Sequence, residues 1–136
     1  MNPRALVRAG LLVIGIPQLI VGVWAAFAQV SFFNEFPGID IAWLPEFGPY
    51  NDHLAADAGA GLLAAGVLAL AAAIVPERRV VQVALAGWLA FAIPHTVFHA
   101  LAYDVLPGVA NVANFALLSL TVIVPIALIP VSRRLP

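Results

Sequence analysis

The sequence predicts an all-α integral membrane protein, a bundle of four transmembrane helices, and three observations support this fold class. The 136 residues are 63% hydrophobic and only 10% charged, whereas a soluble domain carries about 25% charged residues. Four apolar runs occupy residues 9–28, 54–75, 80–102 and 112–131. Each reaches the roughly 20 residues that a helix needs to cross a bilayer. Asp57 is the only charged residue within these runs.

The first run, residues 9–28, has features of a signal peptide. It follows Arg4 and Arg8 and ends in the small-residue string "AAFAQV". However, its apolar stretch is longer than the roughly 7–15 residues of a typical signal core. We therefore interpret it as a retained transmembrane span.

The link after this run, residues 31–53, is long and aromatic, "SFFNEFPGIDIAWLPEFGPYNDH". Aromatic side chains favour the level of the lipid headgroups, and the link holds Phe32, Phe33, Phe36, Trp43 and Phe47. Because Pro37, Pro45 and Pro49 interrupt it, a regular helix throughout is excluded. Two interpretations stay open, a folded cap over the outer end of the bundle or a segment lying on the membrane surface.

The second run, residues 54–75, is rich in small residues, "AADAGAGLLAAGVLALAAA". Small residues at four-residue spacing, such as Gly61 and Ala65, allow helix backbones to approach closely in lipid. This predicts that the second span is the central packing helix. Asn51 or Asp52 is expected to be its N-cap, since both types accept hydrogen bonds from the first turn of a helix.

The third and fourth runs follow short connections. The turn "PERR" before residue 80 is so short that the second and third spans must be antiparallel neighbours. The link "YDVLPGVAN" pairs the third and fourth spans in the same way. Pro17, Pro94 and Pro125 are expected to bend their spans. The chain therefore reads as one compact domain, residues 1–136.

The charged residues predict the orientation in the membrane. All six basic residues fall on one side of the predicted bundle, namely Arg4, Arg8, Arg78, Arg79, Arg133 and Arg134. By the positive-inside rule this side is cytoplasmic, so both termini are expected inside the plasma membrane. Six of the seven acidic residues belong to the outer half, namely Glu35, Asp40, Glu46, Asp52, Asp57 and Asp104.

The candidate functional residues are histidines and one aspartate at matching depths. In "PHTVFHA", His95 and His99 stand one helical turn apart on one face, and His53 and Asp57 do the same on the second span. Asp57 and His99 both lie three residues inside their spans, about 4.5 Å at 1.5 Å per residue. Antiparallel neighbours would place all four in one layer near the outer surface. Polar residues at such positions mark functional sites.

Three imidazoles and one carboxylate suit Zn²⁺, Cu²⁺ or Fe²⁺. We therefore predict a metal site formed by His53, Asp57, His95 and His99, in which Asp57 either binds the metal or orients a ligating histidine. The residues expected to support it are Gln29, Tyr103, Asn111 and Asn114. Since the inner half of the bundle is almost wholly apolar, a continuous ion path across the membrane is not expected.

Other uses of these residues stay open. Asp57, His99 and Asn114 would also suit a buried hydrogen-bond network that locks the bundle. A b-type haem is less favoured, because His95 and His99 share one helix face. A quinone or another lipophilic ligand beneath the aromatic link fits the usual pattern of apolar walls with few polar groups. The absence of cysteine excludes disulfides and thiol chemistry.

The string "GPYNDHLAADAGAG", followed by "PHTVFH", resembles small four-span membrane proteins of actinobacteria that have no assigned function. The overall layout is similar to the DoxX-like four-helix group. The resemblance implies the four-helix fold, and some DoxX-like proteins are linked to redox or oxidative-stress systems. A thiol-based role does not carry over, because this chain lacks cysteine.

The sequence thus favours a metal site that serves a redox reaction or metal handling. The alternative is an accessory subunit of a larger membrane complex with no chemistry of its own. The expected partners are the lipid bilayer and either such a complex or further copies of the chain, and no nucleic acid is expected.

Overall fold

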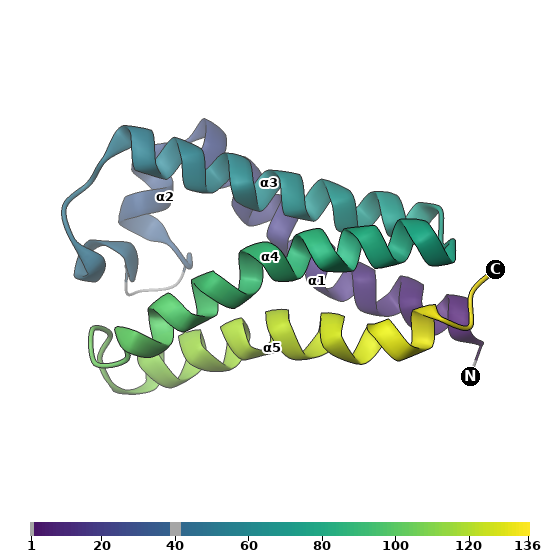
Figure 1. Ribbon diagram of the computed structural model, residues 1–136. Helices are drawn as coiled ribbons and strands as arrows, with labels where there is room; N and C mark the ends of the chain where they lie inside the picture. Colours follow the sequence, from purple (N-terminus) through teal and green to yellow (C-terminus); the bar gives the residue numbers. More distant parts are fainter. Residues whose placement is uncertain (1, 39–41) are drawn as a thin grey trace.

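The computed structural model describes residues 2–38 and 42–136, and within them it contains helices and no strand (Figure 1). The elements are α1 (Pro3–Phe27), α2 (Gln29–Glu35), the 3₁₀ helix η1 (Leu44–Phe47), α3 (Asp52–Ile74), α4 (Arg78–Leu101) and α5 (Gly108–Ser132). Asp40, one of the acidic residues predicted for the outer half, lies outside the described residues.

The four long helices α1, α3, α4 and α5 are long and apolar enough to cross a membrane. They overlap the four predicted spans and begin two to six residues earlier, because each helix extends beyond its apolar run to its capping residues. At the start of α3, the Asn51 side chain accepts a hydrogen bond from the backbone N–H of Leu54 at 2.9 Å. Asn51 is therefore the N-cap, and Asp52 is the first helical residue.

Helices α1 and α3 pack with their backbones in direct contact. A Cβ atom added to Gly59 would collide with the backbone of Ala26, and one added to Gly22 would collide with the backbone of Leu63. Small residues allow this approach, as predicted for the second span. The predicted glycine, Gly61, instead faces α4, where an added Cβ would lie 3.6 Å from the ring of Phe91.

Helices α4 and α5 form a second pair, joined by a hydrogen bond between helices. The buried Trp88 donates its indole N–H to the carbonyl oxygen of Thr121 at 2.7 Å. Residue 125, which would donate to this carbonyl in a regular helix, is a proline and has no N–H. In lipid no water can replace the missing donor, so the indole satisfies a carbonyl that Pro125 leaves unpaired.

The two helix pairs meet at one end of the molecule and diverge at the other (Figure 1). The basic end contains both termini and the turn between α3 and α4, where the Arg78 N–H donates to the carbonyl of Pro136 at 3.0 Å. The core lies in this half and includes Val7, Leu11, Val81 and Leu85. The opposite, loop end contains the connections from α1 to α3 and from α4 to α5.

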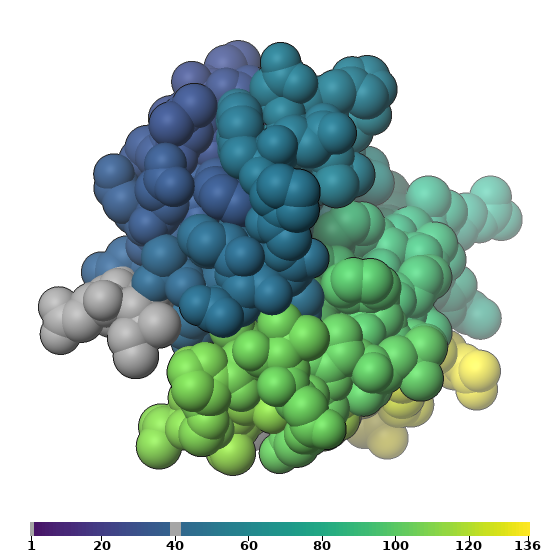
Figure 2. All heavy atoms as spheres, turned by 90° about the vertical axis from the view of Figure 1, so that its left-hand side faces the viewer, coloured from purple at the N-terminus to yellow at the C-terminus, as the bar shows by residue number. Residues whose placement is uncertain are grey.

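At the loop end, the space between the diverging pairs is occupied by residues 29–38 and 42–50, which we call the cap segment. Within it α2 packs against α1 and α3, and η1 packs against α2. An aromatic series runs from Trp24 of α1 through Phe32 and Phe36 to Trp43, with ring centroids 5.1 to 5.9 Å apart. The first and last pairs pack edge to face, and the Phe32–Phe36 pair is tilted. In Figure 2, which looks onto the loop end, the blue atoms of this region lie against the green atoms of the α4–α5 connection.

Candidate functional site

His95 and His99 lie next to each other in the last turns of α4, at the loop end. Their ring centroids are 4.8 Å apart, with an interplanar angle of 74°. Both side chains are partly buried. The four-residue spacing places them on one helix face, and the structure therefore retains this predicted pair.

Aromatic rings surround the two imidazoles. Phe91, one turn before His95, stacks on its ring at a centroid distance of 5.3 Å and an angle of 22°. On His99, the ring of Phe47 from η1 packs edge to face at 4.8 Å, and Phe98 packs at 5.4 Å. The cap segment thus reaches α4 through Phe47 and covers part of the histidine pair.

Asn114 of α5 contacts the imidazole of His99. Its side-chain nitrogen lies 3.2 Å from Nδ1 of His99. With the Asn114 amide in this orientation, its nitrogen can only donate, so Nδ1 is the acceptor and the neutral ring carries its proton on Nε2. In this arrangement Nε2 of His99 is a hydrogen-bond donor. Within residues 2–38 and 42–136, the ring of His95 makes no hydrogen bond.

His53 and Asp57 form a separate pair on α3. Nε2 of His53 lies 3.3 Å from a carboxylate oxygen of Asp57, and the side chains are 85% and 68% exposed. Both residues belong to the first two turns of α3, where this helix has diverged from α4 (Figure 1). The cap segment lies between the two helices at this level.

The predicted centre of four ligands is therefore present as two separate pairs. In the part of the chain that the structure describes, no group of three or more His, Asp or Glu side chains is placed to hold a metal ion. The helix rise gives the depth of the four residues along the bundle axis. The lateral distance between α3 and α4 depends on helix packing, which depth does not determine.

The four supporting residues have different surroundings. Asn114 contacts His99, as described above, and Asn111, one turn earlier on α5, is buried with 8% of its surface exposed. Tyr103 is exposed and packs its ring on Phe115 at 5.9 Å. Gln29 donates to the carbonyl of Ala26 at 2.6 Å, and so satisfies the end of α1.

Sequence reasoning missed two aromatic contributors to the site. Phe91 stands four residues before His95, so their contact was open to prediction from helical spacing. Phe47 was expected only at the headgroup level. Its contact with His99 joins residues 52 positions apart, and no local pattern indicates such a contact.

No family model, curated protein or solved structure matches this chain. The features that bear on function are therefore the geometry of the residues around His99 and the four helices that are long and apolar enough to cross a membrane.

Proposed function

We propose that this protein binds a lipophilic ligand with a hydrogen-bond-accepting group, such as the carbonyl of a quinone, at His95 and His99. The observation that carries the proposal is the contact between the Asn114 amide nitrogen and Nδ1 of His99. In this amide orientation the ring proton of His99 is on Nε2, so the ring offers a hydrogen-bond donor to a ligand. A ligand carbonyl is the matching acceptor.

The surroundings favour a flat, apolar ligand. Phe91, Phe47 and Phe98 present ring faces and edges around the two imidazoles. Aromatic rings stack on conjugated ligands, and sites with apolar walls and few polar groups are typical of lipophilic small molecules.

The test is quinone binding by the purified protein in lipid nanodiscs, measured with a short-chain naphthoquinone by isothermal titration calorimetry. We expect saturable binding that weakens about tenfold or more in His99→Ala, since one hydrogen bond in an apolar site contributes about 1.5 kcal/mol. His53→Ala is the matched control, because His53 lies at the same end of the bundle and is exposed. Equal weakening in both variants, or no saturable binding, contradicts the proposal.

Metal binding is the second candidate, and the adjacency of His95 and His99 favours it. Two imidazoles one turn apart can hold one transition-metal ion such as Zn²⁺, Cu²⁺ or Fe²⁺. Since the described residues place no third ligand beside them, the remaining ligands would come from a second copy of the chain or from another subunit. Elemental analysis of native protein, with His95→Ala and His99→Ala as controls, separates this candidate from the first.

An accessory role in a larger membrane complex is distinguished by extraction in a mild detergent. If the protein is an accessory subunit, it should co-migrate with other membrane proteins, and His99→Ala should not change this. A homogeneous species made only of this chain argues against that role. The loop end is proposed to face the outside of the plasma membrane, because all six arginines are placed toward the basic end.

A further inference from the structure

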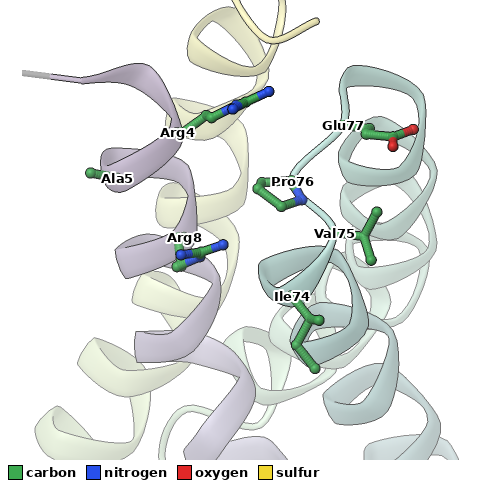
Figure 3. Close-up of a pocket in the computed structure, with 7 residues that line it drawn as sticks. All are labelled: Arg4, Ala5, Arg8, Ile74, Val75, Pro76 and Glu77. Atoms are coloured by element: carbon green, nitrogen blue, oxygen red, sulfur yellow. The ribbon is translucent and has the colours of Figure 1, made fainter.

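A pocket of about 410 Å³ opens at the basic end, between the start of α1 and the turn from α3 to α4 (Figure 3). Arg4 and Arg8 line one side, and Ile74, Val75 and Glu77 line the other. This pocket is at the opposite end of the bundle from His95 and His99. It is independent of the function proposed above.

The two arginines are arranged to bind an anion. They stand one turn apart on α1, and both side chains extend toward the α3–α4 turn (Figure 3). Nε of Arg8 donates to the carbonyl of Ala73 at 2.9 Å, in the last turn of α3. This bond orients the guanidinium of Arg8 and leaves its terminal amino groups available as donors.

The charge of the pocket is not neutralised by the chain. The lining residues include two guanidinium groups and one carboxylate, that of Glu77, and Figure 3 shows this carboxylate pointing away from both arginines. Among the described residues, neither Arg4 nor Arg8 forms an ion pair. The pocket therefore has a net positive charge and unused donors.

The pocket lies where a lipid headgroup would lie. With 25 residues, α1 is about 37 Å long at 1.5 Å per residue and exceeds the roughly 30 Å hydrocarbon core. Its first turns therefore extend into the headgroup layer. Beside the arginines, Ile74 is 75% exposed and Val75 is 46% exposed, so an apolar surface adjoins the charged one.

We propose that this pocket binds a phosphate group that has no positive charge beside it in the same molecule. An anionic phospholipid and free phosphate both carry such a group. Guanidinium groups bind phosphate oxygens in bidentate fashion, which suits Arg8 as oriented by Ala73. Ile74 and Val75 would contact the glycerol and the first acyl carbons. Clusters of arginine on the cytoplasmic side are a known feature of anionic-lipid recognition.

The test is a titration of the whole protein in detergent by native mass spectrometry, with three probes. These are phosphatidylglycerol, phosphatidylcholine with the same acyl chains, and inorganic phosphate. We expect the protein to prefer phosphatidylglycerol, and we expect Arg4→Gln to weaken that binding about tenfold or more, the loss typical of one charged hydrogen bond. Arg4→Gln should fold normally, because the Arg4 side chain makes no hydrogen bond to the described residues.

Arg134→Gln is the matched control, because it removes the same charge at the same end but lies outside the pocket. We expect it to change binding by less than about threefold, since it removes no donor from the pocket and acts only through a distant, screened charge. If inorganic phosphate displaces phosphatidylglycerol, and does so only when Arg4 is present, free phosphate is the ligand. If inorganic phosphate does not displace phosphatidylglycerol, the lipid is the ligand. Equal effects of the two variants, or equal binding of both lipids, would overturn the proposal.

Discussion

Single side chains in this protein satisfy backbone groups that the helices themselves leave unpaired. Trp88 donates to the Thr121 carbonyl that Pro125 cannot serve, and Arg8 donates to the Ala73 carbonyl in the last turn of α3. In the hydrocarbon core, which supplies no hydrogen-bond partners, an unpaired carbonyl such as that of Thr121 would cost several kcal/mol. At the polar end of α3, where water is available, an unpaired Ala73 carbonyl would cost less. These two side chains therefore contribute to stability through their donors as well as through their packing.

The role of Trp88 is tested by replacing it with phenylalanine, which keeps an aromatic ring and removes the N–H. We expect Trp88→Phe to lower the free energy of unfolding by about 1–3 kcal/mol, because the Thr121 carbonyl loses its donor. In a Pro125→Ala background, residue 125 can donate to that carbonyl, so the loss should be smaller. A double-mutant cycle from SDS titration measures the difference. An identical loss in both backgrounds would show that Pro125 is unrelated to this bond.

The protonated nitrogen of His99 can be changed through Asn114. A carboxylate only accepts hydrogen bonds, so at alkaline pH, where the imidazole is neutral, Asn114→Asp should move the ring proton of His99 to Nδ1 and leave Nε2 as an acceptor. We expect this variant to lose quinone binding, and ¹⁵N NMR of histidine-labelled protein to report the changed tautomer. Asn111→Asp, on the same helix face one turn away, serves as the control for added charge. Retention of the Nε2–H form in Asn114→Asp would contradict this assignment.

At the scale of the helices, two different kinds of contact hold the molecule together. The pair α1–α3 relies on glycines that bring the backbones together, with Gly22 and Gly59 at the closest points. The pair α4–α5 relies on larger side chains and on hydrogen bonds from Trp88 and Thr96. Dispersion and close packing are the main forces between helices in lipid, so the glycine contact makes α1–α3 the more tightly packed pair.

The glycine contact is tested by adding one methyl group at two positions of α3. We expect Gly59→Ala to destabilise the protein by about 1–3 kcal/mol, because the new Cβ collides with the backbone of Ala26. Gly61→Ala places its Cβ in ordinary contact with Phe91. It should be neutral or stabilising by up to about 1 kcal/mol, the helix-propensity gain of alanine. SDS titration followed by circular dichroism compares them, and equal stability of the two variants would contradict the packing described.

At the scale of the whole molecule, the two helix pairs converge at the basic end and diverge at the loop end, where the cap segment lies between them (Figure 1). The two ends therefore differ in chemistry. The basic end has an aliphatic core and an arginine-lined pocket, and the loop end has aromatic packing around His95 and His99. A lipophilic ligand suits the loop end, whereas an anionic group suits the basic end.

We predict that the loop end faces outward and the basic end faces the cytoplasm. Because the chain has no cysteine, single introduced cysteines can test this orientation. Asp104→Cys places a single thiol in the α4–α5 connection, and Arg134→Cys places one near the C-terminus. With a membrane-impermeant maleimide on intact cells, we expect labelling of residue 104 only, because arginine-rich ends stay cytoplasmic. Residue 134 should react after permeabilisation. The reverse pattern would invert the orientation.

The sequence by itself determined the features that depend on local chemistry. Length and hydropathy located four helices, the residue types at positions 51 and 52 indicated an N-cap of α3 at one of the two, and four-residue spacing paired His95 with His99. The presence of small residues in the second span also indicated close helix packing, although Gly59 rather than Gly61 makes the contact. Each of these follows from the period and the termini of a helix, which a short stretch of sequence contains.

Only the tertiary structure decided which of these features come together. It separated His53 and Asp57 from His95 and His99, placed Phe47 on His99, and brought Asn114 to Nδ1 of the same ring. The physical reason is that α3 packs along α1 through glycines and so diverges from α4 toward the loop end. Depth along a helix can be counted from the sequence, whereas the distance between helices is set by how their surfaces fit.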